Sequence, residues 1–440
     1  MLQEALIDVA TFALPENIDA LRAHLDPNWI EEALCYAGTG SIRRRRLPAE
    51  QVVWLVIGMA LYRNEPIENI VERLELALPD KRGTLLAKST IAQARQRLED
   101  LALEYLFTVT AAEWSARSAE QDRWRGFALY GWDGTTLRVP DSPENREEFG
   151  GQRAGGGRGE SGYPQVRVVA AMALRSHVLS DFRFADYHTG ETTLARGLWD
   201  SMPENSLAIF DRNFLIKSQL VRFETKGNRH WLTRSKSNTR WAVVKHLGRN
   251  DDLVELEIKE PGMPSTWQIR AIHYQRRGFP RSTLLTSLID ADTYPADELI
   301  ALYHERWELE IAYDEIKTHL LQRHEAIRSR TPQGVRQELW GIALVYNLIR
   351  LEMERAATEA GVSPTRISFT AAVMHIVSEL SWLRGQRLAL GTIPSRLARI
   401  RQRLKRLVLP ERRTKRSYPR AVKLKMSNYP RKRPKKAVRK

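Results

Sequence analysis

Residues 303–317 read YHERWELEIAYDEIK, and this stretch carries the pattern that indicates both the fold and the chemistry of the chain. On a helix that turns by 100° per residue, four polar side chains share an arc of about 60°. They are Tyr303, Arg306, Glu310 and Lys317. Leucine and isoleucine form the adjoining face, and Glu308 faces away from the arc. A carboxylate flanked by a guanidinium and an ammonium predicts a metal ligand within a phosphate-binding group. The alternative is a salt-bridged surface helix.

Two aspartates lie upstream, each at the end of a predicted strand. A strand over 127–132 is expected to enter a turn at Asp133, and a short buried strand over 207–210 ends at Asp211. With Glu310 they would meet at one edge of an open sheet. Carboxylates this close repel one another unless cations lie between them, and hard oxygen ligands suit Mg²⁺ or Mn²⁺. Taken singly, each acid also fits an ordinary turn, cap or surface position.

The segments between these carboxylates predict an α/β core. Two apolar runs pair as a hairpin around Arg175–His177, and a helix is expected over 189–202. Residues 223–282 alternate at period two and predict a separate small antiparallel sheet. A single long helix is expected over 296–320.

The first 120 residues are predicted to be helical. One expected helix, KSTIAQARQRL over 88–98, begins with a hydroxyl cap and ends with basic residues. It has the character of a recognition helix in a helix-turn-helix-like unit, with an ordinary surface helix as the alternative. The residues expected to contact DNA are Lys88, Arg95 and Arg97.

A glycine-rich stretch, GGQRAGGGRGESG, covers residues 150–162. It lacks the Gly-Lys-Ser/Thr of a nucleotide-binding P-loop, so no nucleotide is expected. We interpret it as a loop at the active edge that DNA orders through Arg153 and Arg158, with simple disorder as the alternative.

Composition excludes several classes of protein. The longest apolar run, residues 52–61, is shorter than the roughly 20 residues that span a bilayer, and the acidic N-terminus differs from a secretory signal. Cys35 is the single cysteine among 440 residues, which excludes an internal disulfide framework and a Cys-rich metal site. One cysteine also fits a reducing compartment.

The net charge of +16 is concentrated at the C-terminus. Residues 401–440 contain 18 Lys or Arg and one acid, Glu411, whereas the first 400 residues contain 51 basic and 52 acidic residues. Such a tail predicts a polyanionic partner, most simply DNA or RNA, although a basic tail can also serve solubility alone.

With these motifs the chain resembles the DDE transposases of the insertion sequence 4 family. The spacing Tyr303-x2-Arg306-x3-Glu310-x6-Lys317 matches the Y-R-E-K signature of that family. Asp133 in WDGTTLRVPD and Asp211 in AIFDRNF are similar to its two aspartates. The resemblance covers about residues 15–350.

The resemblance implies an α/β fold with an RNase H-like catalytic core. Its expected parts are a helical N-terminal DNA-binding domain over 1–120, a catalytic domain over 121–345 with a β-rich insertion at about 223–282, a helical region over 346–410, and a basic, disordered tail over 411–440.

The resemblance also implies roles for individual residues. Asp133, Asp211 and Glu310 would bind two Mg²⁺ or Mn²⁺ ions, and three further side chains would hold DNA phosphates: Tyr303, Arg306 and Lys317. Trp307 would pack near the DNA, with core packing as the alternative.

The implied reaction is metal-dependent cleavage at the ends of an insertion sequence, by way of a DNA hairpin, and transfer of the 3′-OH into target DNA. The implied partners are double-stranded DNA, as terminal inverted repeats and target, and a second copy of the chain on paired ends. A place in the bacterial cytoplasm, on the nucleoid, is expected, with no membrane. The alternatives are another metal-dependent nuclease with an RNase H-like core, and a non-catalytic DNA-binding descendant of a transposase.

Overall fold

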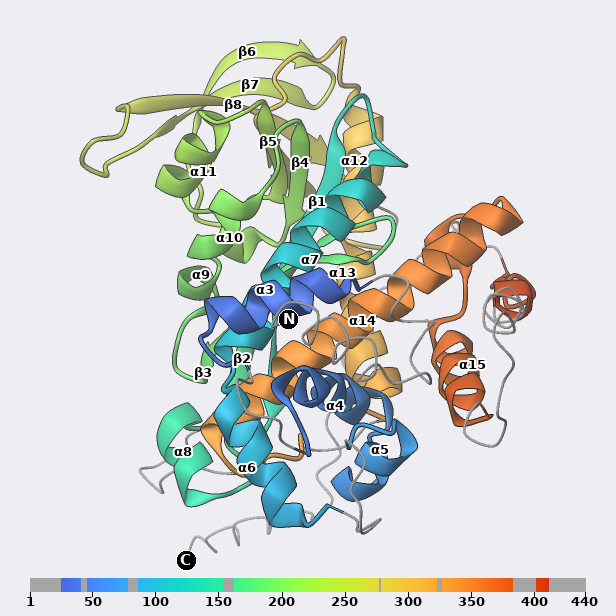
Figure 1. The fold of residues 1–440 in the computed structure, drawn as a ribbon. Helices are drawn as coiled ribbons and strands as arrows, with labels where there is room; N and C mark the ends of the chain where they lie inside the picture. The colour runs from blue at the N-terminus through green and yellow to red at the C-terminus, as the bar shows by residue number, and fades with distance from the viewer. Residues whose placement is uncertain are drawn as a thin grey trace, which may run out of the picture.

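The strands described in the computed structural model form one nine-stranded sheet in the upper part of the view in Figure 1, with helices below it and to its right. The structure describes residues 25–40, 46–77, 86–152, 162–276, 278–322, 327–382 and 401–410. The strand order is β3-β2-β1-β4-β5-β9-β8-β7-β6.

The first five strands make the half of the sheet that carries the site. They are β1 (Ala128–Arg138), β2 (Gln165–Ala173), β3 (Leu179–Asp186), β4 (Ser206–Phe210) and β5 (Arg229–Arg234). β1, β4 and β5 run parallel, and β2 and β3 continue from β1 as an antiparallel hairpin. This order and these directions are those of an RNase H-like core, so the predicted fold class is confirmed.

The other four strands extend the same sheet. They are β6 (Ala242–Gly248), β7 (Asp251–Glu257), β8 (Thr266–Tyr274) and β9 (Ser282–Thr286). β9 pairs with β5 through Leu232↔Thr286, and β8, β7 and β6 follow by antiparallel pairing. The prediction of a separate small sheet over 223–282 is therefore wrong. The strands have the expected alternation, but period two cannot reveal that β5 and β9 bond to each other.

Alternate residues of β1 face two different cores. Leu129 packs into the core shared with the helices α7 (Leu101–Glu120) and α14 (Pro332–Ala360). Tyr130 and Trp132 pack into a second core on the other face of the sheet. The helices α9 (Glu191–Leu194), α10 (Arg196–Ser201) and α11 (Lys217–Glu224) cover that second face. Both faces are covered, as a sheet with parallel strands requires.

Helices dominate the N-terminal part, as predicted. They are α3 (Pro27–Tyr36), α4 (Ala49–Leu61), α5 (Ile67–Arg73), α6 (Lys88–Leu98) and α7 (Leu101–Glu120), and α8 (Pro143–Phe149) follows β1. Twelve of the thirteen residues of α4 are buried, because this helix lies against α14 as well as α3, α5 and α6. The cap of α6 differs from the prediction, since Ala87 stands at the N-cap and supplies no side-chain hydrogen bond.

Beyond the sheet, helices extend to the C-terminal side. They are α12 (Ala296–Glu305), α13 (Trp307–Asp314), the π-helical segment η3 (Glu315–Leu320), α14 (Pro332–Ala360), α15 (Phe369–Trp382) and two 3₁₀ turns, η2 (Arg212–Phe214) and η4 (Pro364–Arg366). The helix predicted over 296–320 is thus interrupted at Arg306 and widens after Asp314. The helix predicted over 189–202 is likewise divided, between α9 and α10.

A buried ionic cluster joins the N-terminal helices to α14. Arg63 donates to the carboxylate of Glu338 at 2.8 Å, and both side chains are 2% exposed. The backbone N–H of Arg328 donates to the same carboxylate at 3.0 Å, and the hydroxyl of Ser329 also donates to it. We call this group the Glu338 cluster.

Candidate active site

The two aspartates stand side by side where parallel pairing between β1 and β4 ends. The last register pair is Trp132↔Phe210, and Asp133 and Asp211 are the next residues on each strand. Asp211 leaves the sheet and begins η2, where its side chain accepts a hydrogen bond from the backbone N–H of Asn213 at 3.0 Å.

The turn predicted at Asp133 is not observed. β1 continues to Arg138, because β2 pairs with it antiparallel and the register pair Asp133↔Ala170 extends that ladder. Gly134 serves close packing rather than a turn. A Cβ atom at this position would lie 2.4 Å from Cδ of Glu191.

The pKa of Asp133 is raised to about 6, mainly by burial, and the negative charges of Asp211 and Glu191 contribute to this rise. The backbone N–H of Gly134 and the guanidinium of Arg306 act in the opposite direction. A carboxyl group in this environment gains from a nearby cation, which would compensate for lost solvation and for repulsion by the other acids.

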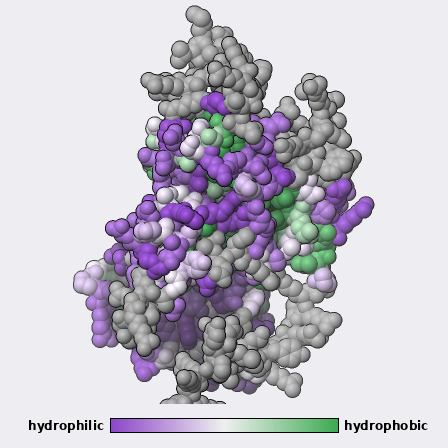
Figure 2. All heavy atoms as spheres, turned by 90° about the horizontal axis from the view of Figure 1, so that it is seen from below, coloured by the Kyte–Doolittle hydropathy of each residue, from purple (hydrophilic) through white to green (hydrophobic). Residues whose placement is uncertain are grey.

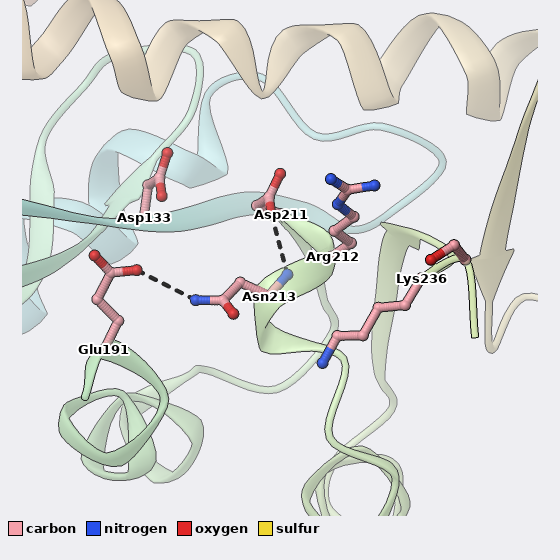
Figure 3. A pocket seen from close by; sticks show the side chains of 7 residues that line it. Asp133, Glu191, Asp211, Arg212, Asn213 and Lys236 are labelled. Carbon is pink, nitrogen blue, oxygen red and sulfur yellow. Dashed lines mark hydrogen bonds between the residues drawn. The ribbon is translucent and has the colours of Figure 1, made fainter. Parts of the chain in front are cut away.

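An open pocket of about 560 Å³ lies at this edge of the sheet. Its lining residues are Asp133, Glu191, Asp211, Arg212, Asn213, Lys236 and Ser237. Figure 3 shows the carboxylates of Glu191 and Asp133 near each other on one side of the pocket and Lys236 on the other. The pocket thus combines three acids with two cationic side chains, which fits a site for a metal ion and a phosphate.

Arg306 connects the predicted helical arc to the sheet. Its guanidinium lies 3.4 Å from Oδ2 of Asp133 and 3.2 Å from Oε1 of Glu310. The side chains of Asp133, Arg306 and Glu310 are 23%, 17% and 34% exposed. Arg306 therefore neutralises two carboxylates at once while remaining within reach of solvent.

Lys317 and Tyr313 hold the same helix against β1. Nζ of Lys317 donates to Oγ1 of Thr135, two residues beyond Asp133 on the same face of the strand. The hydroxyl of Tyr313 donates to the carbonyl oxygen of Asp133 at 2.5 Å and accepts from the N–H of Ala170 at 3.1 Å. Burial lowers the pKa of Lys317.

Tyr303, which belongs to the predicted arc, and Trp307, which follows Arg306, differ in exposure. Tyr303 is buried, and burial raises the pKa of its phenol, on which the charge of Arg306 acts in the opposite direction. Trp307 is 46% exposed, so this side chain is not packed in the core.

The acidic residues of this site provide only part of the arrangement that a divalent cation needs. Asp133 and Asp211 line one pocket, and Glu310 is joined to Asp133 through Arg306. Within the described part of the chain, no three His, Cys, Asp or Glu side chains are arranged around one metal position. Oxygen donors of the type preferred by Mg²⁺ are thus present, and Arg306 stands between two of them.

Three residues of α6 were expected to contact DNA, and for one of them, Arg95, the structure contradicts this prediction. Its guanidinium donates to Gln337 Oε1 at 3.1 Å, to Ser329 Oγ at 3.1 Å and to Gly334 O at 3.2 Å. Burial lowers the pKa of Arg95. This side chain joins α6 to α14 and is not presented to DNA, because it points toward the interior from a short basic helix.

Lys88 and Arg97 are exposed on the same helix. Lys88 Nζ lies 3.0 Å from Glu68, with 81% of the lysine side chain exposed. Arg153, Arg158 and the tail over 411–440 lie outside the described residues. Part of the basic segment before that tail is paired with α14, since Lys405 Nζ lies 2.6 Å from Glu359.

Three functional candidates were not predicted from the sequence. Glu191 lines the pocket and accepts from Arg167 at 3.1 Å and from Asn213 Nδ2 at 3.3 Å. Lys236 lines the opposite side. Tyr313 lies three residues after Glu310, next to the predicted arc, so helical spacing could have identified it. Glu191 and Lys236 carry no comparable signal.

Hydrophilic side chains predominate on the face shown in Figure 2, where hydrophobic ones form only small patches. Within the described ranges, no helix combines the length and apolarity needed to cross a bilayer.

Two family profiles match this chain. The profile described as the insertion element 4 transposase N-terminal matches residues 15–108, and the transposase DDE domain matches residues 132–348. The first covers the N-terminal helices, and the second begins just before Asp133 and ends within α14.

Known proteins are similar over long stretches. "Transposase InsG for insertion sequence element IS4" of Escherichia coli (strain K12) is 35% identical over 426 residues, which is 95% of each chain. "Putative transposase InsZ" of the same organism is 38% identical over 51% of this chain and 74% of its own length. The cryo-EM structure of the piggyBac transposase synaptic complex with hairpin DNA has a TM-score of 0.41 and 10% identity, over 90% of this chain and 86% of that chain.

Proposed function

The chain belongs to the insertion sequence 4 family of DDE transposases, and from this premise we propose which of its residues carry the reaction. It is a DNA transposase of an insertion sequence. The observation that carries the residue assignment is the contact of Arg306 with both Asp133 and Glu310, beside the pocket that Asp133 shares with Asp211.

Asp133, Asp211 and Glu310 are the residues that would hold divalent cations, Mg²⁺ or Mn²⁺, in a pair. Such ions supply charge neutralisation at the attacked phosphorus and a stronger oxygen nucleophile. Arg306 keeps Asp133 and Glu310 from repelling each other before the cations bind, because a guanidinium offers donors to two carboxylates at once.

Tyr303, Arg306 and Lys317 are assigned to DNA phosphates. Arg306 and Lys317 both lie close to β1, so a phosphate that approaches Asp133 meets cationic donors on the helix side. Trp307 is a candidate for contact with DNA, because its side chain is 46% exposed next to Arg306.

The proposed reaction begins with cleavage of one strand at the end of the element, which leaves a 3′-OH. The 3′-OH attacks the opposite strand, which joins the two strands in a hairpin and displaces the flanking DNA. Water then opens the hairpin and restores the 3′-OH, which attacks target DNA. The residues of the pocket act by positioning phosphates and by neutralising charge, which are the main contributions in phosphoryl transfer.

The proposed partners are double-stranded DNA, as terminal inverted repeats and as target, and a second copy of the chain on paired ends. The bacterial cytoplasm, at the nucleoid, is the proposed location. The net charge of +16 supports a polyanionic partner. Inverted repeats that flank the gene would support transposition over the action of a repair nuclease.

Replacement of Glu310 by Gln tests the assignment. The substitution keeps the size of the side chain but removes a negative charge that cations and Arg306 require. We expect cleavage of end DNA in Mg²⁺ to fall by roughly three orders of magnitude or more, with folding and end binding retained. Single-turnover cleavage, circular dichroism and an electrophoretic mobility shift measure the three properties.

Asp314→Asn is the matched control on the same helix. Its side chain is 63% exposed and accepts from Thr318 at 2.6 Å. Glu308, which helical spacing places away from the arc, is unsuitable because His177 Nε2 lies 2.9 Å from it and its side chain is 14% exposed. Normal cleavage by Glu310→Gln, or equal losses in both variants, would contradict the assignment.

A further inference from the structure

The turn between β2 and β3 holds the catalytic helix on both sides of Arg306. Nε and Nη2 of Arg175 donate to the two carboxylate oxygens of Glu305, each at 3.0 Å. Two residues further along the turn, Nε2 of His177 lies 2.9 Å from Oε2 of Glu308. Glu305 ends α12 and Glu308 lies in the first turn of α13, so these contacts flank the interruption at Arg306.

His177 is fixed in an uncommon conformation. Its φ is 65°, in the left-handed region that few residues other than glycine adopt, and its side chain is 1% exposed. The N–H of His177 donates to the carbonyl of Ala173 at 2.8 Å, which closes the turn. Strained conformations of this kind persist where the surroundings determine them, often near functional sites. Here the result is an imidazole aimed at the catalytic helix.

A buried ion pair holds the next part of the same helix. Glu315, the first residue of η3, accepts from Arg350 at 2.5 Å and from the hydroxyl of Tyr346 at 2.7 Å, and His177 Nδ1 lies 3.4 Å away. Burial alone would raise the pKa of Glu315, but Arg350 and His177 outweigh it and lower the pKa to about 2. An ionised carboxylate thus fixes the start of the segment that carries Lys317.

Stability alone accounts poorly for this arrangement. A buried ion pair adds little net stability, because desolvation of both charges offsets their attraction. Phosphoryl transfer, in contrast, depends on geometry, and a displacement of about 1 Å can cost roughly a hundredfold in rate. The contacts described all converge on the stretch from Glu305 to Lys317, which contains Arg306 and Glu310.

We propose that Arg175 and His177 are positioning residues, which place Arg306 and Glu310 against Asp133 through Glu305 and Glu308. In this role they act through their contacts with Glu305 and Glu308 and not through contact with DNA or a cation. The proposal rests on the proposed function, since it assigns the turn a role in that reaction.

Two substitutions of His177 test the proposal. Asn tolerates a positive φ but is too short to reach Glu308, whereas the amide nitrogen of Gln can take the place of Nε2 and restore a donor. With end DNA bound in Mg²⁺, we expect single-turnover cleavage by His177→Asn to slow by roughly 10- to 100-fold, as when support for an active-site residue is lost. His177→Gln should recover to within about threefold of the wild-type rate, and DNA affinity should be unchanged in both variants.

Two further variants separate positioning from stability. Glu338→Gln lowers the stability of the protein by altering the Glu338 cluster, which is not part of the catalytic helix. This variant should cleave DNA at the wild-type rate at temperatures where it is folded. Arg175→Met removes a side chain that is 28% exposed, so folding should be retained, and cleavage should slow by about tenfold.

Equal slowing by His177→Asn and Glu338→Gln, failure of His177→Gln to recover, or a wild-type rate for Arg175→Met would each overturn the proposal. In contrast, cleavage by Asp133→Asn at the wild-type rate would refute the proposed function itself. The two failures are therefore distinguishable.

Discussion

Arginine–carboxylate pairs occur in two settings in this protein, the pocket and the interior along α14. In the pocket, Arg306 lies 3.4 Å from Asp133 and 3.2 Å from Glu310, and all three side chains are partly exposed. In the interior, Arg63 lies 2.8 Å from Glu338, and both side chains are almost fully buried. The residue types are the same, but the distances and the access of solvent differ.

The difference indicates which charges can exchange partners. A cation or phosphate can replace a partner of Arg306, because solvent already reaches these groups. No such replacement is available to Arg63 or Glu338, where an uncompensated charge would remain in the interior. Pocket substitutions should therefore change the reaction, and interior substitutions should change the free energy of unfolding.

The largest effect on stability is expected for Glu338→Gln. Removal of this charge breaks the buried ion pair with Arg63 and weakens the bonds to Arg328 and Ser329. The free energy of unfolding should fall by about 3–5 kcal/mol, measured by denaturant titration. Glu65→Gln is the control, because its pair with Arg73 is more exposed and should contribute at most about 1 kcal/mol. If both variants lost a similar amount of unfolding free energy, the proposed difference between buried and exposed ion pairs would be contradicted.

An intermediate effect, on the reaction and not on stability, is expected for Glu191→Gln. Glu191 lines the pocket and is held by Arg167 and Asn213, so loss of its charge should lower the affinity of the pocket for cations near Asp133. Cleavage and Mn²⁺ affinity should fall by roughly 10- to 100-fold. Isothermal titration with Mn²⁺ and single-turnover cleavage measure the two quantities.

Glu298→Gln is the control for this substitution. It breaks another half-exposed pair, with Arg125, outside the pocket. If Glu191→Gln bound Mn²⁺ as tightly as this control, the pocket would not depend on its third acid.

The smallest effects should come from surface cations of α6. Lys88→Ala and Arg97→Ala should each weaken binding of end DNA by about 1 kcal/mol, and binding of random DNA by less, in fluorescence anisotropy titrations. Arg95→Ala should lower stability instead, because Arg95 bonds to α14. Equal losses on both DNAs would place end recognition elsewhere, and DNA-specific losses in Arg95→Ala would contradict its interior role.

The sequence predicts the sheet core well because its signals are local. Asp211 follows a fully buried strand, and the hairpin turn at Arg175–His177 lies where the apolar runs end. The helical spacing of Arg306 and Glu310 brings these side chains together despite the interruption, which is too small to rotate one away from the other.

Other features depend on contacts that spacing cannot reveal. A basic helix gives no sign that Arg95 points inward and Lys88 outward, because α14 is more than 230 residues away along the chain. An Asp-Gly pair is typical of a turn, whereas Gly134 lies within β1, close to the side chain of Glu191. In both cases tertiary packing overrides a local preference.

The residues of the site lie far apart in the sequence, so the ribosome adds them at different times. Asp133 and Asp211 are translated well before Arg306, and Arg350, which anchors η3, is later still. At roughly 5–20 residues per second, the ribosome takes on the order of 10–40 s to pass from Asp133 to Arg350. For most of that interval, until Arg306 and Glu310 are translated, β1 has no α13 against it. The residues assigned here to the reaction are therefore all present only after most of the chain has been synthesised.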